Sequence, residues 1–429
     1  MSEAAQLLVS MLDELGHITD EPGRITRTFL SPAMRRANRL VGDCMIAAGL
    51  EVREDSVGNL IGRLEAAKVG RTGPVRRGGA GRSALHKTLL IGSHLDTVRD
   101  AGRFDGPLGV LLPIVALADL KVRGVKLPFN VEVLGFSEEE GVRFGSAYLG
   151  SEGYTGRLRS ATLKLRDADG ISVGDVLREF NDGKFSLPKP AHSISNLLGY
   201  IEVHIEQGPV LDAKKLAVGV VSAIAGQSRF KLTWTGKAGH AGTTPMALRK
   251  DALAGAAEFT LAAEKLARGT AGLVATVGSL AVSPGAANVI PGSAVHTLDV
   301  RHAKDTVRRT ALFKLGRLAT QIANKRGLKV SWQRTQDNGA VACSPVLTAA
   351  LERSVKAVQG KSLSLVSGAG HDGVVMSSLT PVAMLFVRCR DGLSHHPDEH
   401  ASPKDLAVAL DVMVDFLQQL ATDYTNAHG

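Results

Sequence analysis

A chain of 429 residues, 44% of them hydrophobic and 4% aromatic, can bury a large core, and we predict two domains. The composition excludes a disulfide-rich miniprotein and a disordered chain, whereas the 47 glycines suit an α/β enzyme whose helices pack closely on a sheet. The formal net charge of +9 is modest, and Lys and Arg are interspersed with Asp and Glu, so nucleic-acid binding is the least favoured interpretation.

The three cysteines, Cys44, Cys343 and Cys389, are far apart in the chain and form no CxxC pair. This usage is typical of a reducing compartment and argues against a zinc ribbon. No apolar run is long enough to cross a bilayer, and the first residues lack the basic start and apolar stretch of a signal peptide. We therefore expect a cytoplasmic protein without a membrane partner.

The first part of the chain predicts alternating helices and strands. Helices are expected over 3–16 and 31–49, and a strand pair over 51–64. An apolar strand beginning at Leu89, an apolar helix over 110–120 and a strand over 129–136 form a βαβ pattern, which implies a largely parallel sheet.

The segment 71–87 is rich in Gly and Arg and has no periodicity. We interpret it as a surface loop between two strands, and an anion-binding arm is the alternative.

From about Leu216 the pattern changes to strand pairs with two intervening helices, over 250–268 and 305–326. This order of strands and helices is typical of a compact α+β unit. Beyond it the alternating helices and strands of the first part resume, and the last predicted element is a helix over 403–421. We therefore predict a discontinuous domain, 1–214 and 330–429, with a second domain, 215–329, inserted into it.

Polar residues with metal-binding chemistry follow the strand that begins at Leu89. His94 and Asp96 are two residues apart and lie on one side of an extended chain, and Asp105 follows in a glycine-punctuated loop. The next strand ends in three adjacent carboxylates, 138–140, which repel one another unless a cation lies nearby. Ligands of open α/β sheets bind at such strand ends. We interpret both clusters as parts of one metal site, with an exposed acidic turn as the alternative for the carboxylates.

Two histidine segments are candidates for the rest of this site. His204 lies on a charged strand face with Glu202 and Glu206, and the segment 393–400 is dense in histidine. A structural histidine and a polar loop are the alternatives. Mixed His and carboxylate donors suit Zn²⁺, Mn²⁺, Co²⁺ or Ni²⁺ rather than Ca²⁺, and a shared Asp implies two ions that activate a bridging water. A further carboxylate that binds no metal would take the proton of that water.

Three other motifs each allow both a functional and a structural interpretation. The segment 367–373 matches GxGxxG after a strand, with Asp391 further on, as in a nicotinamide dinucleotide site; its polar centre and the lack of a long helix favour a backbone turn instead. In the inserted domain, His240 has a glycine-rich setting from which it could reach a substrate oxygen. Arg301 is suited to holding a carboxylate bidentately, although each of these residues alone is more often structural.

Seven motifs in this order resemble those of the amidase/hydantoinase/carbamoylase family of two-metal amidohydrolases, relatives of the aminoacylase-type metallopeptidases. The resemblance covers nearly the whole chain, and its motifs are GSHLDT (92–97), FDG (104–106), SEEEGVRF (137–144), HIEQG (204–208), GHAGTTP (239–245), SGAGHD (367–372) and SHHP (394–397). It implies an aminopeptidase-like α/β catalytic domain with a mixed, largely parallel sheet, and an inserted α+β lid domain that also forms a homodimer.

The resemblance also implies a role for each site residue. Glu139 would be the general base, Asp96 would orient a metal ligand, and His240 would stabilise the oxyanion in the neighbouring subunit's site. The implied metal ligands are His94, Asp105 (bridging), Glu140, His204 and His395. The implied substrate-binding residues are Arg301 and Asn288, which hold a carboxylate, with Gln207, Gln227 and Gly370 as further candidates.

The activity that this family resemblance implies is hydrolysis of the carbamoyl amide of N-carbamoyl-L-amino acids, giving the amino acid, CO₂ and ammonia by way of a metal-bridged water. Two divalent ions would be the cofactors, and a small carbamoyl or ureido carboxylate the substrate. Allantoate amidohydrolase and 3-ureidopropionase are alternatives with the same chemistry. A nicotinamide-dependent oxidoreductase and a nucleic-acid binder are alternatives of other classes.

Overall fold

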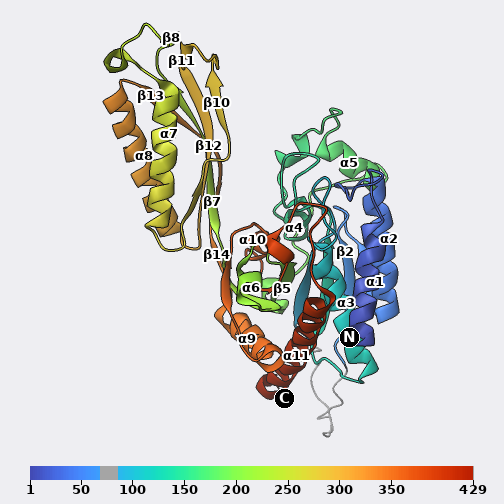
Figure 1. Cartoon of the computed structure of the whole chain (residues 1–429). Helices are drawn as coiled ribbons and strands as arrows, with labels where there is room; N and C mark the ends of the chain where they lie inside the picture. The colour runs from blue at the N-terminus through green and yellow to red at the C-terminus, as the bar shows by residue number, and fades with distance from the viewer. Residues whose placement is uncertain (68–85, 429) are drawn as a thin grey trace. The chain divides into compact units, whose positions relative to one another are not determined.

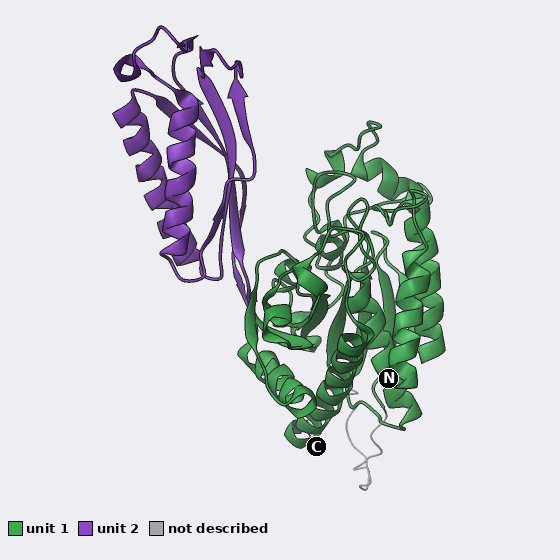
Figure 2. Cartoon of the chain, in the orientation of Figure 1, with its two compact units in different colours: residues 1–222, 343–429 green, residues 223–342 purple. Residues whose placement is uncertain are grey.

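The computed structural model describes residues 1–67 and 86–428 and divides the chain into two compact units (Figure 2). Unit 1 comprises Met1–Ser222 and Cys343–Gly429, and unit 2 comprises Ala223–Ala342. The sequence placed the boundaries earlier, at 214 and 330. They differ because β6 (Val218–Ile224) pairs with β16 (Val382–Val387) of unit 1, while β13 (Lys329–Asn338) belongs to the sheet of unit 2. Apart from its last two residues, the Gly/Arg-rich segment 71–87 lies outside the described residues.

Unit 1 is built on a mixed nine-stranded sheet. Its centre is parallel, because β3 pairs in parallel with β4 and β5, and β5 does so with β16. Antiparallel pairs flank this centre, between β2 and β4 and between β6 and β16. The order is β1 (Glu51–Glu54), β2 (Leu60–Leu64), β4 (Asn130–Phe136), β3 (Thr88–His94), β5 (Leu197–Ile205), β16, β6 and β14 (Val341–Ala342), and β15 (Ser364–Ser367) pairs with β6. The short β14 and the last two residues of β6, with which it pairs, fall within the bounds of unit 2.

Five helices cover one face of this sheet and share a single apolar core with it (Figure 1). They are α1 (Glu3–Gly16), α2 (Pro32–Ala48), α3 (Pro107–Val122), α9 (Pro345–Gln359) and α11 (Pro403–His428). The predicted start of the second helix is confirmed, because the Ser31 side chain accepts a hydrogen bond from the Met34 N–H and Pro32 occupies the first turn.

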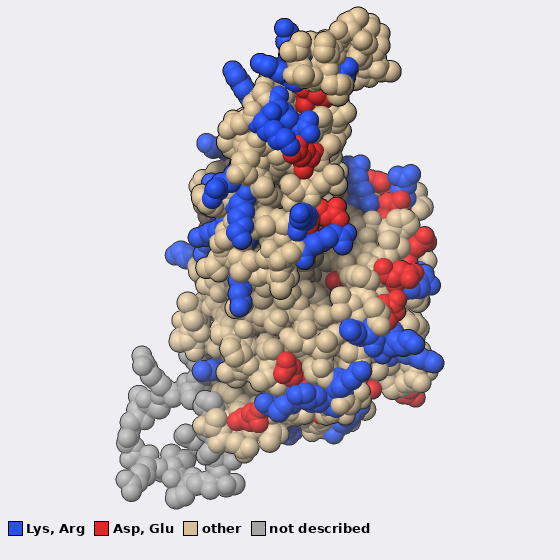
Figure 3. Space-filling view, turned by 60° about the vertical axis from the view of Figure 1, so that its left-hand side comes forward, with Lys and Arg blue, Asp and Glu red and all other residues tan. Residues whose placement is uncertain are grey.

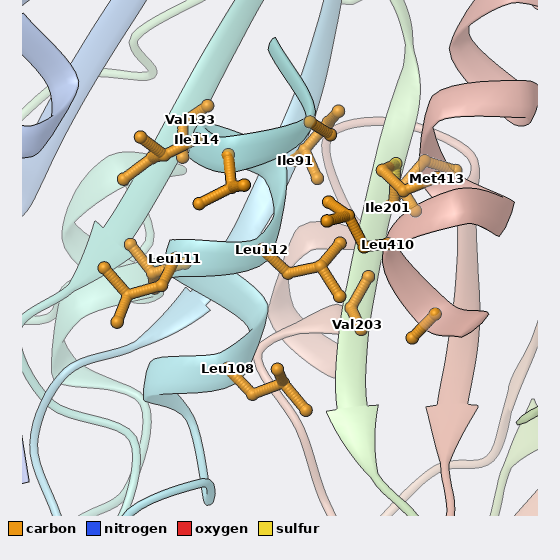
Figure 4. Packing of buried hydrophobic residues seen from close by; sticks show 14 of the residues in the cluster. Ile91, Leu108, Leu111, Leu112, Ile114, Val133, Ile201, Val203, Leu410 and Met413 are labelled. Atoms are coloured by element: carbon orange, nitrogen blue, oxygen red, sulfur yellow. The ribbon is translucent and has the colours of Figure 1, made fainter. Parts of the chain in front are cut away.

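The helix α3 is central to this core. It is apolar on almost every side, and Figure 4 shows Leu111 and Leu112 among side chains of the neighbouring strands and of α11. Val203 of β5 and Ile91 of β3 point into the same cluster and are fully buried. Burial of each such side chain stabilises the folded state by roughly 1.5–3 kcal/mol relative to exposure to solvent. The contact between α3 and the sheet therefore determines which face of the sheet is buried in this core. Alternate residues of β5 therefore face the other side, as the charged face of 200–206 predicted.

The opposite face carries shorter elements: α4 (Leu149–Tyr154), α5 (Val173–Phe180) and α10 (Gly373–Met376); α6 (Val210–Lys214) follows β5. A smaller apolar cluster lies under α4 and α5, with Phe29, Leu149 and Leu177 at its centre.

Unit 2 is an α+β layer. Its sheet has the order β10 (Leu280–Ser283), β12 (Ser293–His302), β7 (Gly226–Thr235) and β13, with β9 (Val274–Thr276) beside β12. The helices α7 (Ala252–Arg268) and α8 (Asp305–Arg326) pack on one face, where Leu232 and Trp234 are buried. A two-stranded ribbon, β8 (Gly239–His240) with β11 (Val289–Ile290), completes the unit.

No helix in the described part of the chain is both long and apolar enough to cross a membrane. On the face shown in Figure 3, Lys and Arg side chains are scattered and mixed with Asp and Glu. This mixture is typical of a solvated surface and does not resemble the continuous basic stripe that a nucleic-acid backbone requires.

Candidate metal centre

The candidate site lies where four neighbouring parallel strands end. His94 is the last residue of β3, and His204 is the last but one of β5. Glu139 and Glu140 follow β4, and His395 lies in the loop after β16. Because the four strands are adjacent in the order β4-β3-β5-β16, their carboxyl ends deliver these side chains to one edge of the sheet.

Asp105, in the loop between β3 and α3, lies at the centre of this group. Its Oδ1 is 3.0 Å from His204 Nε2 and 3.8 Å from His94 Nε2. Its Oδ2 is 3.2 Å from His395 Nε2, which is itself 3.6 Å from Glu140 Oε1. The two oxygens of one carboxylate thus face two different donor sets.

These donors fit a metal ion. Three sets have their ligand atoms within 4.8 Å of one another: His94, Asp105 and His204; Asp105, Glu140 and His395; and His94, Glu139 and Glu140. A tetrahedral ion with bonds of about 2.0–2.2 Å to nitrogen and oxygen needs donors at such separations. Neutral imidazole and carboxylate together are the donors of divalent transition metals.

Asp96 connects two parts of the site. Its Oδ1 accepts a hydrogen bond from the Glu139 N–H at 3.0 Å, and its Oδ2 accepts one from the Glu140 N–H at 3.1 Å. His94 Nδ1, the ring nitrogen opposite the one that faces Asp105, lies 3.0 Å from the backbone carbonyl oxygen of Asp96 and 3.4 Å from its Oδ1. A backbone carbonyl or a carboxylate at this nitrogen fixes the orientation of a histidine ligand, and here the carbonyl of Asp96 is the nearer partner.

Gly106 explains part of the FDG motif. Its φ is +86°, and a methyl group there would overlap the His94 ring. Only glycine allows the backbone to pass so close to this imidazole.

Electrostatics also favour a cation. Burial raises the pKa of Glu139, and the adjacent Glu140 raises it further. Burial and the charge of Asp105 raise the pKa of Glu140 to about 7. Carboxyl groups this close cannot all be ionised without positive charge nearby, and a divalent ion would supply it.

Two residues of this site were not singled out from the sequence. Glu399 is buried, and its Oε1 accepts hydrogen bonds from the N–H groups of Phe104 (3.0 Å) and Asp105 (3.1 Å). Ser394 Oγ lies 2.9 Å from an oxygen of Asp105 and 2.9 Å from one of Glu399. Both belong to the histidine-dense segment 393–400. Their closeness in sequence to the predicted ligand His395 was the feature from which they could have been predicted.

Gln207 has a different neighbourhood from the one expected for a substrate-binding residue. Its Nε2 is 3.0 Å from Asp105 Oδ2 and 3.3 Å from His395 Nε2. Its φ of +54° is in the left-handed region. Gln207 therefore lies beside two candidate ligands, and its predicted contact with the substrate stays a prediction.

A second buried polar layer lies behind His204. The Glu202 carboxylate accepts hydrogen bonds from Ser93 Oγ at 3.0 Å and from the Gly373 N–H at 2.9 Å. The ring of His371 packs against His204 with 4.5 Å between centroids.

The GxGxxG segment is thus fixed to β5, and the helix after it, α10, has only four residues. A dinucleotide site requires a longer helix whose N-terminus faces the pyrophosphate, so the oxidoreductase interpretation loses its structural basis.

In unit 2, His240 and Asn288 lie side by side. The Ala241 N–H donates to the Asn288 carbonyl oxygen at 2.9 Å, and His240 pairs with Val289. His240 Nδ1 accepts hydrogen bonds from the N–H groups of Gly242 (3.0 Å) and Thr243 (3.2 Å). The proton of the neutral ring is therefore on Nε2, which makes this exposed histidine a hydrogen-bond donor to a ligand oxygen.

Arg301 and Gln227 face each other across β12 and β7. Both donate to Asp299: Arg301 Nε and Nη2 at 3.0 and 2.9 Å, and Gln227 Nε2 at 2.7 Å. Gln227 is at the start of β7, whereas His240 lies beyond its end at Thr235. Eight residues of strand span about 26 Å. The Gln227–Arg301 pair and the His240–Asn288 pair of one chain therefore lie far apart.

Comparisons with known proteins show the family of this chain. The family model "Peptidase family M20/M25/M40" matches residues 90–419. An N-carbamoyl-L-amino acid amidohydrolase from Geobacillus stearothermophilus is 39% identical over 96% of this chain and 97% of its own length. Allantoate deiminase 2 from Glycine max is also 39% identical, over 96% of this chain and 89% of its own length. The chain belongs to the M20/M25/M40 family.

Among solved structures, an amidase of the hydantoinase/carbamoylase family from Burkholderia multivorans matches this family member with a TM-score of 0.88 and 30% identity, covering 97% of this chain and 98% of its own. The resemblance drawn from the seven motifs is confirmed, as is the mixed α/β fold. The chain is a metal-dependent hydrolase of the class that cleaves C–N bonds in linear amides.

Proposed function

We propose that this enzyme hydrolyses the carbamoyl amide of N-carbamoyl-L-amino acids to the amino acid, CO₂ and ammonia, with two divalent ions (Zn²⁺, Mn²⁺, Co²⁺ or Ni²⁺) as cofactors. The observation that carries the proposal is Asp105, whose two carboxylate oxygens face two separate donor sets. Glu139 lies beside both, in a set with His94 and Glu140.

The bound ions would lower the pKa of water and polarise the carbamoyl carbonyl. Glu139 takes the proton of the attacking water and later delivers it to the leaving nitrogen. Asp96 keeps His94 oriented and holds the Glu139–Glu140 backbone through its two hydrogen bonds. Glu399 and Gln207 hold Asp105 in its central position.

We propose that unit 2 is the lid and dimerisation unit. Arg301, oriented by Asp299, would hold the substrate carboxylate together with Gln227 of the same chain and Asn288 of the partner subunit. His240 would donate its Nε2 proton to the developing oxyanion in the partner subunit's site. The three free cysteines fit a reducing cytoplasm as the place of action.

Allantoate is a second candidate substrate. Four allantoate deiminases, one of them described as probable, are 39–40% identical to this chain over 96–97% of its length. Allantoate is also a ureido carboxylate, so the same donors, base and carboxylate clamp would serve it.

A substrate panel on metal-reconstituted protein tests the function. The panel contains N-carbamoyl-L-amino acids of different side chains, their D-enantiomers, allantoate and 3-ureidopropionate, and ammonia release is measured. We expect the highest kcat/KM for an N-carbamoyl-L-amino acid and loss of activity on chelation. A preference for allantoate would favour the second candidate, and inactivity toward every ureido carboxylate would overturn both.

A further inference from the structure

Tyr148 has an unusual backbone conformation next to the metal centre. Its φ is +71° and its ψ +21° at the start of α4, in the left-handed region that bulky side chains rarely adopt. Its N–H donates to the Glu139 carbonyl oxygen at 3.2 Å. Strained residues of this kind cluster at functional sites, where the surrounding fold imposes a side-chain direction.

The side chain of Tyr148 reaches Gly370 with its hydroxyl group. A methyl group at Gly370 would overlap the Tyr148 hydroxyl, so the hydroxyl lies directly against this glycine. The next residue, His371, packs on the candidate ligand His204. The lack of a side chain at Gly370 leaves room for the hydroxyl, and the predicted contact of Gly370 with the substrate stays a prediction.

The surroundings of the hydroxyl are acidic. After burial, the charges that act most on Tyr148 are those of Glu139, Asp372, Glu202 and Glu140. Burial and these carboxylates raise the pKa of Tyr148 well above its ordinary value, so the phenol keeps its proton. Within residues 1–67 and 86–428 the hydroxyl has no hydrogen-bond partner, and it is not among the unpaired atoms sealed from solvent. It is therefore an unpaired group beside the proposed base that can both donate and accept a hydrogen bond.

We propose that the Tyr148 hydroxyl binds the ureido group of the substrate beside Glu139 and makes the site selective for carbamoyl over simple acyl groups. This inference rests on the proposed function. The substrate carboxylate is assigned to Arg301, so the neutral ureido end of the substrate lies beside Glu139. The terminal NH₂ of a ureido group can donate to the phenol oxygen, which accepts as well as donates hydrogen bonds, whereas an acetyl group has only a methyl group at that position. A site built around such a hydrogen bond rejects analogues that lack it.

The test compares Tyr148→Phe with the parent on the N-carbamoyl and N-acetyl derivatives of the same L-amino acid. We expect kcat/KM for the N-carbamoyl substrate to fall about 10- to 100-fold and that for the N-acetyl substrate to change less than about threefold. Selectivity for the carbamoyl group therefore falls, while metal content per chain is unchanged. The matched control is Tyr154→Phe, which removes a hydroxyl that donates to Glu132 at 2.8 Å. It should leave selectivity at the parental value.

A second variant, Gly370→Ala, tests the geometry. Its added methyl group displaces the hydroxyl, so it should lower carbamoyl selectivity in the parent as Tyr148→Phe does. In the Tyr148→Phe background the overlap is gone, and the same substitution should have little further effect.

The outcomes separate the two hypotheses. Equal selectivity in the parent and Tyr148→Phe, with the parent active on carbamoyl substrates, would overturn this inference and leave the function standing. Inactivity of the parent toward all ureido substrates would overturn the function and the inference with it. Additive effects of the two substitutions would refute the contact between Gly370 and the hydroxyl.

Discussion

Glu139 and Glu140 are adjacent in the chain but have different neighbours. Glu140 shares a donor set with Asp105 and His395, whereas among the described residues Glu139 shares one only with His94 and Glu140. We therefore expect Glu139→Gln to keep its metal and to lose roughly 10²- to 10⁴-fold in kcat, the range for general acid–base catalysis. Metal content per chain by elemental analysis and kcat on the best substrate of the panel measure the two effects.

The matched control for this prediction is Glu140→Gln, which changes the neighbouring carboxylate in the same way. It should lower the metal content, because it removes a candidate ligand. If Glu139→Gln lost metal and Glu140→Gln kept it, the two residues would exchange roles.

Single residues also show where prediction from the sequence ends. Asp299 and Arg301 are two apart in a strand, so their contact follows from strand periodicity and could have been predicted. The bonds of Glu399 to the backbone at Asp105 join positions almost 300 residues apart. Nothing local in the sequence specifies such a contact, because it depends on how two loops pack.

At the scale of elements, Glu132 ties three parts of unit 1 together. It lies on β4 and is buried, and its carboxylate accepts hydrogen bonds from Arg63 of β2 and Tyr154 of α4, both at 2.8 Å. His192, in the connection before β5, lies 2.9 Å away. Burial alone would raise the pKa of Glu132, but His192, Tyr154 and Arg63 hold it at about 2.

This pKa predicts a pH dependence of stability. Because the folded-state pKa is below the unfolded value, the carboxylate stabilises the fold fully above about pH 4.5 and loses this effect as the pH falls toward 2. The shift corresponds to about 3 kcal/mol. We expect the difference in unfolding free energy between the parent and Glu132→Gln to shrink by about that amount between pH 5 and pH 2, measured by denaturant titration.

The control for Glu132 is Glu65→Gln. Glu65 binds the same Arg63, but its side chain is 60% exposed. Its substitution should change stability by less than about 0.5 kcal/mol at any pH. A pH-independent difference for Glu132→Gln would contradict the role assigned to this carboxylate.

Elements were predicted well where one periodicity dominates. The apolar strand at Leu89, the apolar helix after it and the strand ending at Phe136 all form as expected, as β3, α3 and β4. The partner of β6 was not predictable, because alternation of side chains does not say which sheet a strand joins. The domain boundary expected at 214 therefore lies at 222 in the structure.

At the scale of the whole molecule, unit 2 carries two groups of proposed substrate residues. Gln227 and Arg301 lie at one end of the β7–β12 pair, and His240 with Asn288 lies beyond the other end, about 26 Å along the strand. One small substrate cannot contact both groups of the same chain. If both act on it, two chains must contribute, which requires a dimer in which each subunit donates His240 to the other.

Hybrid dimers test this arrangement. Glu139→Gln and His240→Ala should each be nearly inactive alone, because one lacks the proposed base and the other the proposed oxyanion donor. Co-expressed with different affinity tags, they form hybrids in which one of the two sites combines Glu139 of one chain with His240 of the other. Purified hybrids should therefore regain about half of the parental kcat per dimer, and a random equal mixture about a quarter. Activity no higher than that of the single variants would show that His240 acts within its own chain or not at all.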